Sequence, residues 1–265
     1  MAEAEFRTSM PPAFPAMMAA LVMWAALGCA GMYAYVALGD RNGALAGTVL
    51  LLGALTMAIG CFTVARDASK AAYGAAGLVF GIAVMTAVLP TTGSIFIDTV
   101  ILLTLIVAAM VVFVRTVDMP RIRSVRLRNL SLAVIIVLPI ILAFAEAAAL
   151  GLRFWETFPL GTPSFLFVPF MAIWGFAEEA LFRGVVQRSF AAMMPPTSAI
   201  VAAAALNAAY MLFWGSVMYA VFAFLVALLM GVLYQRSRSV VYVGTIRALM
   251  DTWLIIALLV LGLSG

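Results

Sequence analysis

The chain has 265 residues, of which 66% are hydrophobic and 10% are charged, and it contains no histidine. A soluble globular domain has roughly 45–50% apolar and about 25% charged residues, so this composition excludes a water-soluble protein, and the missing histidine excludes any mechanism that needs an imidazole. The net charge is +4. In a membrane protein, an excess of basic residues usually marks the cytoplasmic loops and their contact with anionic lipid headgroups, so no nucleic-acid partner is expected.

Apolar runs of membrane-spanning length dominate the chain. A helix needs about 20 apolar residues to cross a hydrocarbon core of roughly 30 Å, and charge, proline or glycine marks the ends of such runs. The sequence therefore predicts an all-α, polytopic transmembrane helical bundle of nine spans, or of eight if the short break at 214–216 does not separate two helices. The predicted spans are residues 16–39, 43–64, 71–89, 96–114, 130–150, 164–190, 197–213, 217–234 and 241–263.

The basic residues fall mainly on one side of this predicted topology. Arg41 and Arg153 lie on the opposite side, Arg183 and Arg247 lie inside spans, and the other 11 of the 15 lysine and arginine residues share one side. Cytoplasmic loops are enriched in lysine and arginine, so we expect a cytoplasmic N-terminus. Arginine far outnumbers lysine, as is typical of proteins from GC-rich prokaryotic genomes. We therefore expect this multi-pass protein to lie in a prokaryotic plasma membrane.

A basic loop from Arg115 to Arg128 divides the chain into two predicted modules. Residues 1–129 contain four plain apolar spans and end in this loop. Residues 130–265 contain nearly all the charge that falls inside spans. We therefore expect the functional site in the second module.

Away from the span ends, six ionisable residues lie inside the predicted spans, at a cost of about 2.5–3.5 kcal/mol each on insertion scales. With a helical rise of about 1.5 Å per residue, the sixth and ninth spans each place an acid roughly 15–17 Å deep and an arginine roughly 9–11 Å deep. Each of these spans also carries an acid–arginine pair at i,i+4 spacing. The pattern predicts one polar site shared by two helices. The six residues are Glu146, Glu178, Glu179, Arg183, Arg247 and Asp251.

The seventh span supplies two candidate binding residues, Asn207 and Tyr210, at depths of about 15 Å and 20 Å that reach the same layer. Glu146 lies nearer the outer surface, and we expect it to belong elsewhere. A neutralised network that only fixes helix register is the alternative interpretation. The remaining three acids outnumber the two arginines, and a buried carboxyl without a basic partner favours a site for proton transfer.

Residues 178–184 read Glu-Glu-Ala-Leu-Phe-Arg-Gly. This stretch resembles the EExxxR signature, in its EExxFRG form, of the CAAX protease and bacteriocin-processing (CPBP or ABI) family, and the resemblance covers roughly 164–262. That family consists of intramembrane glutamic-type endopeptidases. The resemblance implies that Glu178 activates a water for attack on a scissile carbonyl, while Glu179 and Arg183 support the site.

The two histidine motifs of that family, FxxxH and HxxxN/D, both lack their histidine in this chain. The third motif maps onto 247–251, with Arg247 in the histidine position and Asp251 in the Asn/Asp position. The second maps onto 206–210 or onto 207–211. The resemblance implies that these positions orient the water and stabilise the oxyanion. Arg247 stays protonated, so it cannot act as a base, but its charge can stabilise an oxyanion.

Two functions follow from this pattern. Loss of a general acid–base group costs about 10²–10⁴-fold in rate, so we expect an endopeptidase for membrane-anchored or prenylated peptides whose activity is intact, reduced or lost. The alternative is an inactive pseudoprotease that binds or organises a membrane partner. The expected partners are the lipid bilayer and a lipidated peptide or protein. No cofactor is expected, nor a metal, because the available carboxylates lie beside two arginines.

Overall fold

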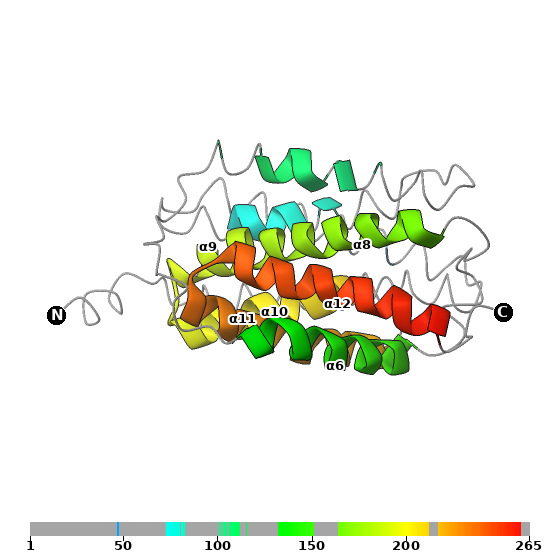
Figure 1. Ribbon diagram of the computed structural model, residues 1–265. Coiled ribbons are helices and arrows are strands. Elements are labelled where there is room, and N and C mark those ends of the chain that lie inside the picture. The colour runs from blue at the N-terminus through cyan, green and yellow to red at the C-terminus, as the bar shows by residue number, and fades with distance from the viewer. Residues whose placement is uncertain are drawn as a thin grey trace.

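A computed structural model describes residues 132–150, 164–211 and 217–260, together with short helical pieces between 47 and 115. Every regular element in this described part is a helix, as predicted for an all-α protein. The helices lie side by side with their axes roughly parallel (Figure 1). In chain order they are α6 (Leu132–Leu150), α8 (Ser164–Glu179), the π-helix η1 (Ala180–Gln187), α9 (Arg188–Ala191), α10 (Pro196–Met211), α11 (Val217–Ser237) and α12 (Val240–Val260).

The five predicted C-terminal spans are helical over their described residues. Helix α11 is 21 residues long and contains an 18-residue stretch with a mean hydropathy of 2.4, so it is long and apolar enough to cross a membrane. Helix α6 contains a shorter apolar stretch, Val134–Ala149. The predicted spans within residues 1–129 fall largely outside the described residues. The count of nine spans, the orientation of the N-terminus and the division after residue 129 therefore stay predictions.

The sixth predicted span is not one continuous α-helix. Helix α8 ends at Glu179, and the next eight residues, Ala180–Gln187, form the π-helix η1 before α9 begins. Hydrogen bonds from residue i to i+5 widen the backbone there, and π-helical turns occur frequently at functional sites. The change of helix type begins directly after the two glutamates of the EExxFRG stretch.

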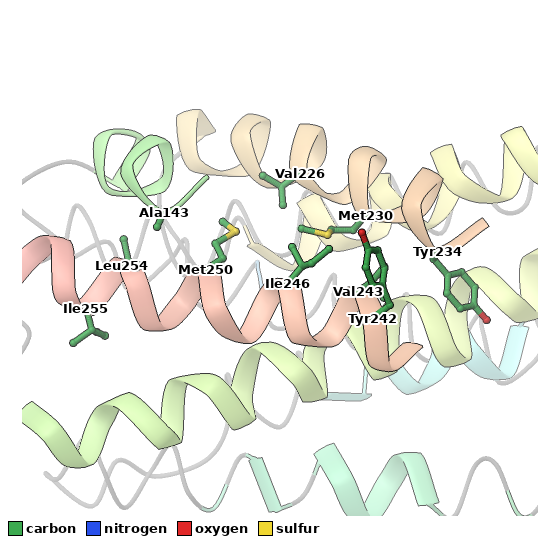
Figure 2. Packing of buried hydrophobic residues seen from close by; sticks show 10 residues of the cluster. All are labelled: Ala143, Val226, Met230, Tyr234, Tyr242, Val243, Ile246, Met250, Leu254 and Ile255. Carbon is green, nitrogen blue, oxygen red and sulfur yellow. The ribbon is translucent and has the colours of Figure 1, made fainter. Parts of the chain in front are cut away.

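Helix α12 is central in the packing of the described part, and its main partners are α8 and α6. Its apolar residues form a cluster with side chains of α6 and α11 (Figure 2). Two glycines let α8 and α12 approach closely. A Cβ atom at Gly244 would lie 2.7 Å from the Phe176 ring, and a Cβ at Gly175 would overlap the Asp251 carboxylate. This close contact sets the polar residues of α8 against those of α12.

A tight turn joins α11 to α12. Arg238 adopts a left-handed conformation with a φ of 52°, and its amide donates to the Tyr234 carbonyl at 2.7 Å. The Ser239 hydroxyl then accepts a hydrogen bond from the Tyr242 amide at 3.2 Å. Such a bond caps the N-terminus of a helix, so this turn fixes where α12 begins.

Candidate active site

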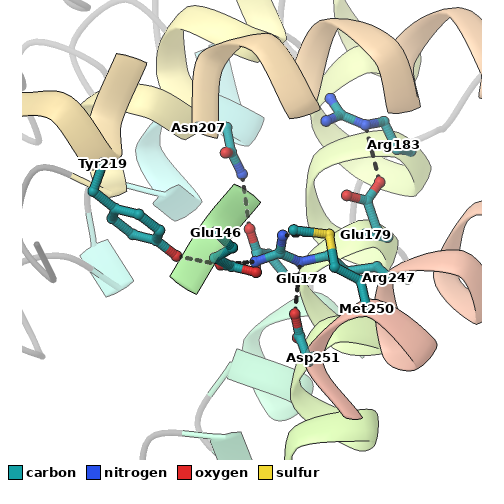
Figure 3. Close-up of polar contacts among 9 residues, drawn as sticks. All are labelled: Glu146, Glu178, Glu179, Arg183, Asn207, Tyr219, Arg247, Met250 and Asp251. Carbon is teal, nitrogen blue, oxygen red and sulfur yellow. Dashed lines mark hydrogen bonds and ion pairs between the residues drawn. The ribbon is translucent and has the colours of Figure 1, made fainter. Parts of the chain in front are cut away.

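A cluster of buried polar side chains lies where five helices meet (Figure 3). Glu178 and Glu179 come from α8, Asn207 from α10, and Arg247 and Asp251 from α12. Glu178 is 8% exposed and Asp251 is 2% exposed. Charged groups are buried this deeply almost only when they are paired, so the cluster depends on its internal contacts. Two residues outside the predicted site, Glu146 of α6 and Tyr219 of α11, complete it.

Arg247 is the central cation of the cluster. Its Nη2 atom lies 3.3 Å from Glu178 Oε2 and 3.6 Å from Glu146 Oε1. Its Nε atom lies 3.3 Å from Asp251 Oδ1, and Nη1 contacts the Met250 sulfur at 3.5 Å. One guanidinium therefore serves three carboxyl groups from three helices.

Glu178 is held by two donors on opposite oxygens. Asn207 Nδ2 donates to Oε1 at 3.1 Å, and Arg247 Nη2 donates to Oε2 at 3.3 Å. A carboxylate has about four acceptor sites, so each oxygen can still accept one more hydrogen. The carboxylate is thus fixed in orientation and remains able to bind a water molecule or to take a proton.

The second glutamate of the pair has a different partner. Arg183 Nε donates to Glu179 Oε2 at 3.0 Å within the same helical segment. Arg183 is fully buried, and this pair lies beside the Arg247 group (Figure 3). Of the two candidates on α10, Asn207 contacts the Glu178 carboxylate, and Tyr210 packs its ring against Phe182, with ring centroids 6.1 Å apart.

The expectation that Glu146 belongs elsewhere is wrong. Its carboxyl accepts a hydrogen bond from the Tyr219 hydroxyl at 2.9 Å and lies beside Arg247. Depth counted from the helical rise locates the backbone of one span from its own end, and it gives neither the relative level of two spans nor the reach of a side chain; the Arg247 side chain extends along α12 toward Asp251. The same count puts Glu146 and Tyr219 at similar depths, about 24 Å and 22 Å from the cytoplasmic ends of their spans. The similar depths of the two residues are the feature of the sequence from which a contact between Tyr219 and Glu146 could have been predicted.

The cluster encloses a small cavity, in which the centre of a water molecule can occupy a volume of about 10 Å³. A cavity of roughly 10–15 Å³ by this measure holds one water. Its polar lining comes from all five helices, and α11 adds an apolar wall. The lining includes Glu146, Glu178, Glu179, Asn207, Tyr219 and Arg247, with Phe222, Ala223, Val226 and Ala227.

The lining can activate a water and stabilise an anion. A fixed carboxylate is a suitable general base, and a buried guanidinium stabilises a developing oxyanion. In the part of the chain that the structure describes, no group of three histidine, cysteine or carboxylate side chains is arranged to hold a metal ion. The carboxylate and the guanidinium support acid–base and electrostatic chemistry.

Residues 159–253 match a family model described as type II CAAX prenyl endopeptidase Rce1-like. The matched segment contains Glu178, Asn207 and Arg247, whereas Glu146 lies outside it. No curated protein and no solved structure gave a significant match. The match over the segment that carries most of the buried cluster supports membership of the CAAX protease family, as the EExxFRG stretch predicts.

Proposed function

We propose that this protein is an intramembrane glutamic-type endopeptidase that cleaves a membrane-anchored or prenylated peptide, with Glu178 as the base. The family match supports the reaction class. The observation that carries the proposal is the position of Glu178 on the wall of a cavity that fits one water, with both oxygens oriented by donors. This arrangement places a base within reach of a nucleophile and a cation within reach of the product oxyanion.

Each residue has a role in the proposed reaction. Glu178 takes a proton from the water as the water oxygen attacks the scissile carbonyl. Arg247 stabilises the oxyanion, and Asp251 holds the Arg247 guanidinium. Asn207 orients Glu178 and so takes the place of the second motif's histidine, although neither predicted register put it in that position. The Glu179–Arg183 ion pair supports the helix that carries the base.

The outer faces of the helices suit a substrate that arrives within the bilayer. Large apolar side chains remain exposed on the outer faces of several helices, including Ile141 of α6, Ile173 of α8 and Leu225 of α11, each more than half exposed. An exposed apolar surface of this kind is typical of lipid contact. We place the protein in a membrane, and more specifically in a prokaryotic plasma membrane, with lipid and a lipidated peptide as its partners.

The proposal is tested by cleavage in reconstituted bilayers. Wild-type protein and Glu178→Gln are incubated with a library of membrane-anchored and prenylated peptides, and products are identified by mass spectrometry. We expect products from the wild type and a loss of about 10²–10⁴-fold in Glu178→Gln. Tyr234→Phe is the control, since this tyrosine is buried in the apolar cluster away from the cavity. Equal cleavage by wild type and Glu178→Gln would rule out the glutamate mechanism.

A pseudoprotease that binds a membrane partner is the second candidate. The observation in its favour is the ion pair between Arg247 and Glu178, because a permanently charged side chain stands beside the base. Arg247→His, with Asp251 kept, separates the two functions if the wild type is inactive. Recovered proteolysis identifies an enzyme that has lost its catalysis, whereas continued inactivity of a folded variant favours a binding role.

A further inference from the structure

We propose that Glu146 is the general acid of this site, which donates a proton to the leaving amine while Glu178 acts as the base. This inference rests on the proposed endopeptidase function. It assigns acid–base chemistry to two carboxyl groups in a chain that has no histidine. Glu146 lies on α6, outside the segment that matches the family model, so the match itself gives it no role.

The first support is geometric. Glu146 and Glu178 both line the one-water cavity, and both contact the same nitrogen, Nη2 of Arg247, at 3.6 Å and 3.3 Å. The two carboxyls therefore face one small space from different helices. Two carboxyls on either side of a water can divide the roles of acid and base between them, as aspartic proteases and glycosidases show.

The second support is the state of the Glu146 oxygens. Oε1 accepts the Tyr219 hydroxyl at 2.9 Å and lies beside Arg247. Oε2 is buried and has no hydrogen-bond partner among the described residues. A protonated carboxyl needs one oxygen that is free to carry and donate its hydrogen. The contacts leave Oε2 of Glu146 available for that purpose, whereas each oxygen of Glu178 already has a donor.

The third support is the charge of the cluster. Four buried carboxyls stand against two guanidinium groups, and Arg183 is occupied by Glu179. Arg247 alone therefore faces three carboxyls, which cannot all be ionised cheaply in a buried site. Of these three ion pairs the one to Glu146 is the longest. The arrangement thus favours a proton on Glu146, the carboxyl with the longest contact to Arg247.

The proposed step balances as follows. Glu178 takes one proton from the water, the remaining hydroxide forms the new bond to the carbonyl carbon, and the carbonyl electron pair moves to the oxygen beside Arg247. The intermediate collapses, the C–N bond breaks, and its electron pair leaves with the nitrogen, which takes the proton from Glu146 Oε2. A proton then passes from Glu178 to Glu146 through the next water in the cavity. No oxidant, metal or cofactor is needed.

Leaving-group dependence separates a general acid from a structural carboxyl. The test compares one prenylated peptide that the wild type cleaves with the same peptide carrying an aryl ester at the scissile position, because an aryloxide leaves without needing a proton. We expect Glu146→Gln to lower kcat about 10²–10⁴-fold on the amide and less than tenfold on the ester. Glu178→Gln should lower both rates, since both reactions need the activated water. A loss of equal size on both substrates, or no loss on the amide, overturns the role of Glu146.

A second pair of variants keeps the test decisive if Glu146→Gln fails to fold. Tyr219→Phe removes the hydrogen bond to Glu146 and leaves every charge in place, and Tyr234→Phe removes a buried hydroxyl from the same helix away from the cavity. We expect Tyr219→Phe to lower kcat on the amide about tenfold and to leave the ester rate and KM unchanged. Tyr234→Phe should leave the amide rate, the ester rate and KM unchanged. Equal rates for the two variants overturn the inference. A wild type that cleaves neither substrate refutes the proposed function itself, whereas Glu178-dependent cleavage without any effect at Glu146 refutes only this inference.

Discussion

Removal of the central cation should destabilise the fold strongly. Arg247→Met keeps a long, flexible side chain of similar reach but leaves Glu146, Glu178 and Asp251 facing one another without a positive charge. Removing one partner of a buried ion pair costs about 3–5 kcal/mol, because the other charge stays buried and unpaired. At 1.4 kcal/mol for each factor of ten, that loss lowers the folding equilibrium constant by roughly 100- to 4,000-fold.

The free energy of unfolding is measured by equilibrium denaturation in mixed micelles, with helical content as the signal. Wild type, Arg247→Met, Asp251→Asn and the double variant form a thermodynamic cycle. We expect the double variant to lose less than the sum of the two single losses, because Asp251→Asn removes one of the charges that the missing arginine would leave unpaired.

Two results would contradict this account of Arg247. A loss of less than 1 kcal/mol in Arg247→Met would show that the arginine is not the charge that keeps the carboxyls buried. Additive losses in the cycle would show that Arg247 and Asp251 do not interact, although their side chains lie 3.3 Å apart.

Two further predictions concern the backbone that positions the site. Gly175→Ala should lower the free energy of unfolding by about 1–3 kcal/mol, because its Cβ overlaps the Asp251 carboxylate and forces α8 away from α12. Gly184→Ala is the matched control, because its Cβ would meet its nearest atom at an ordinary 3.4 Å. Equal losses for the two variants in the same denaturation assay would contradict the prediction. Ser239→Ala should cost about 1 kcal/mol, because it removes the acceptor for the Tyr242 amide at the start of α12; an unchanged unfolding midpoint would argue against this cap.

The helices of the second module could be predicted because the residue types at their ends differ from those inside them. Polar, charged or proline residues interrupt the apolar runs, and α6, α10, α11 and α12 begin and end within a few residues of the predicted bounds. The π-helix at 180–187 could not be predicted in this way. Its residue types also occur in α-helices, and the difference lies in which backbone carbonyl each amide meets.

The site was predictable where one helix supplied both partners and less so where several helices met. The Glu179–Arg183 and Arg247–Asp251 contacts follow from i,i+4 spacing, and both are present. The contact between Asn207 and Glu178 required only that two spans reach the same layer. The position of Glu146 depends on the reach and direction of the Arg247 side chain, which the helical rise does not give.

The excess of carboxyls is the feature that stability alone does not explain. Buried ion pairs can often be replaced by apolar side chains with no loss of stability, so a cluster of four carboxyls and two guanidinium groups is a poor device for holding helices together. A cluster that served only helix register would be expected to balance its charges. Two of the carboxyls, Glu146 and Glu178, face one water-sized cavity, and unbalanced buried carboxyls beside a cavity are typical of functional sites. The charge balance of the cluster therefore favours an enzyme over a scaffold.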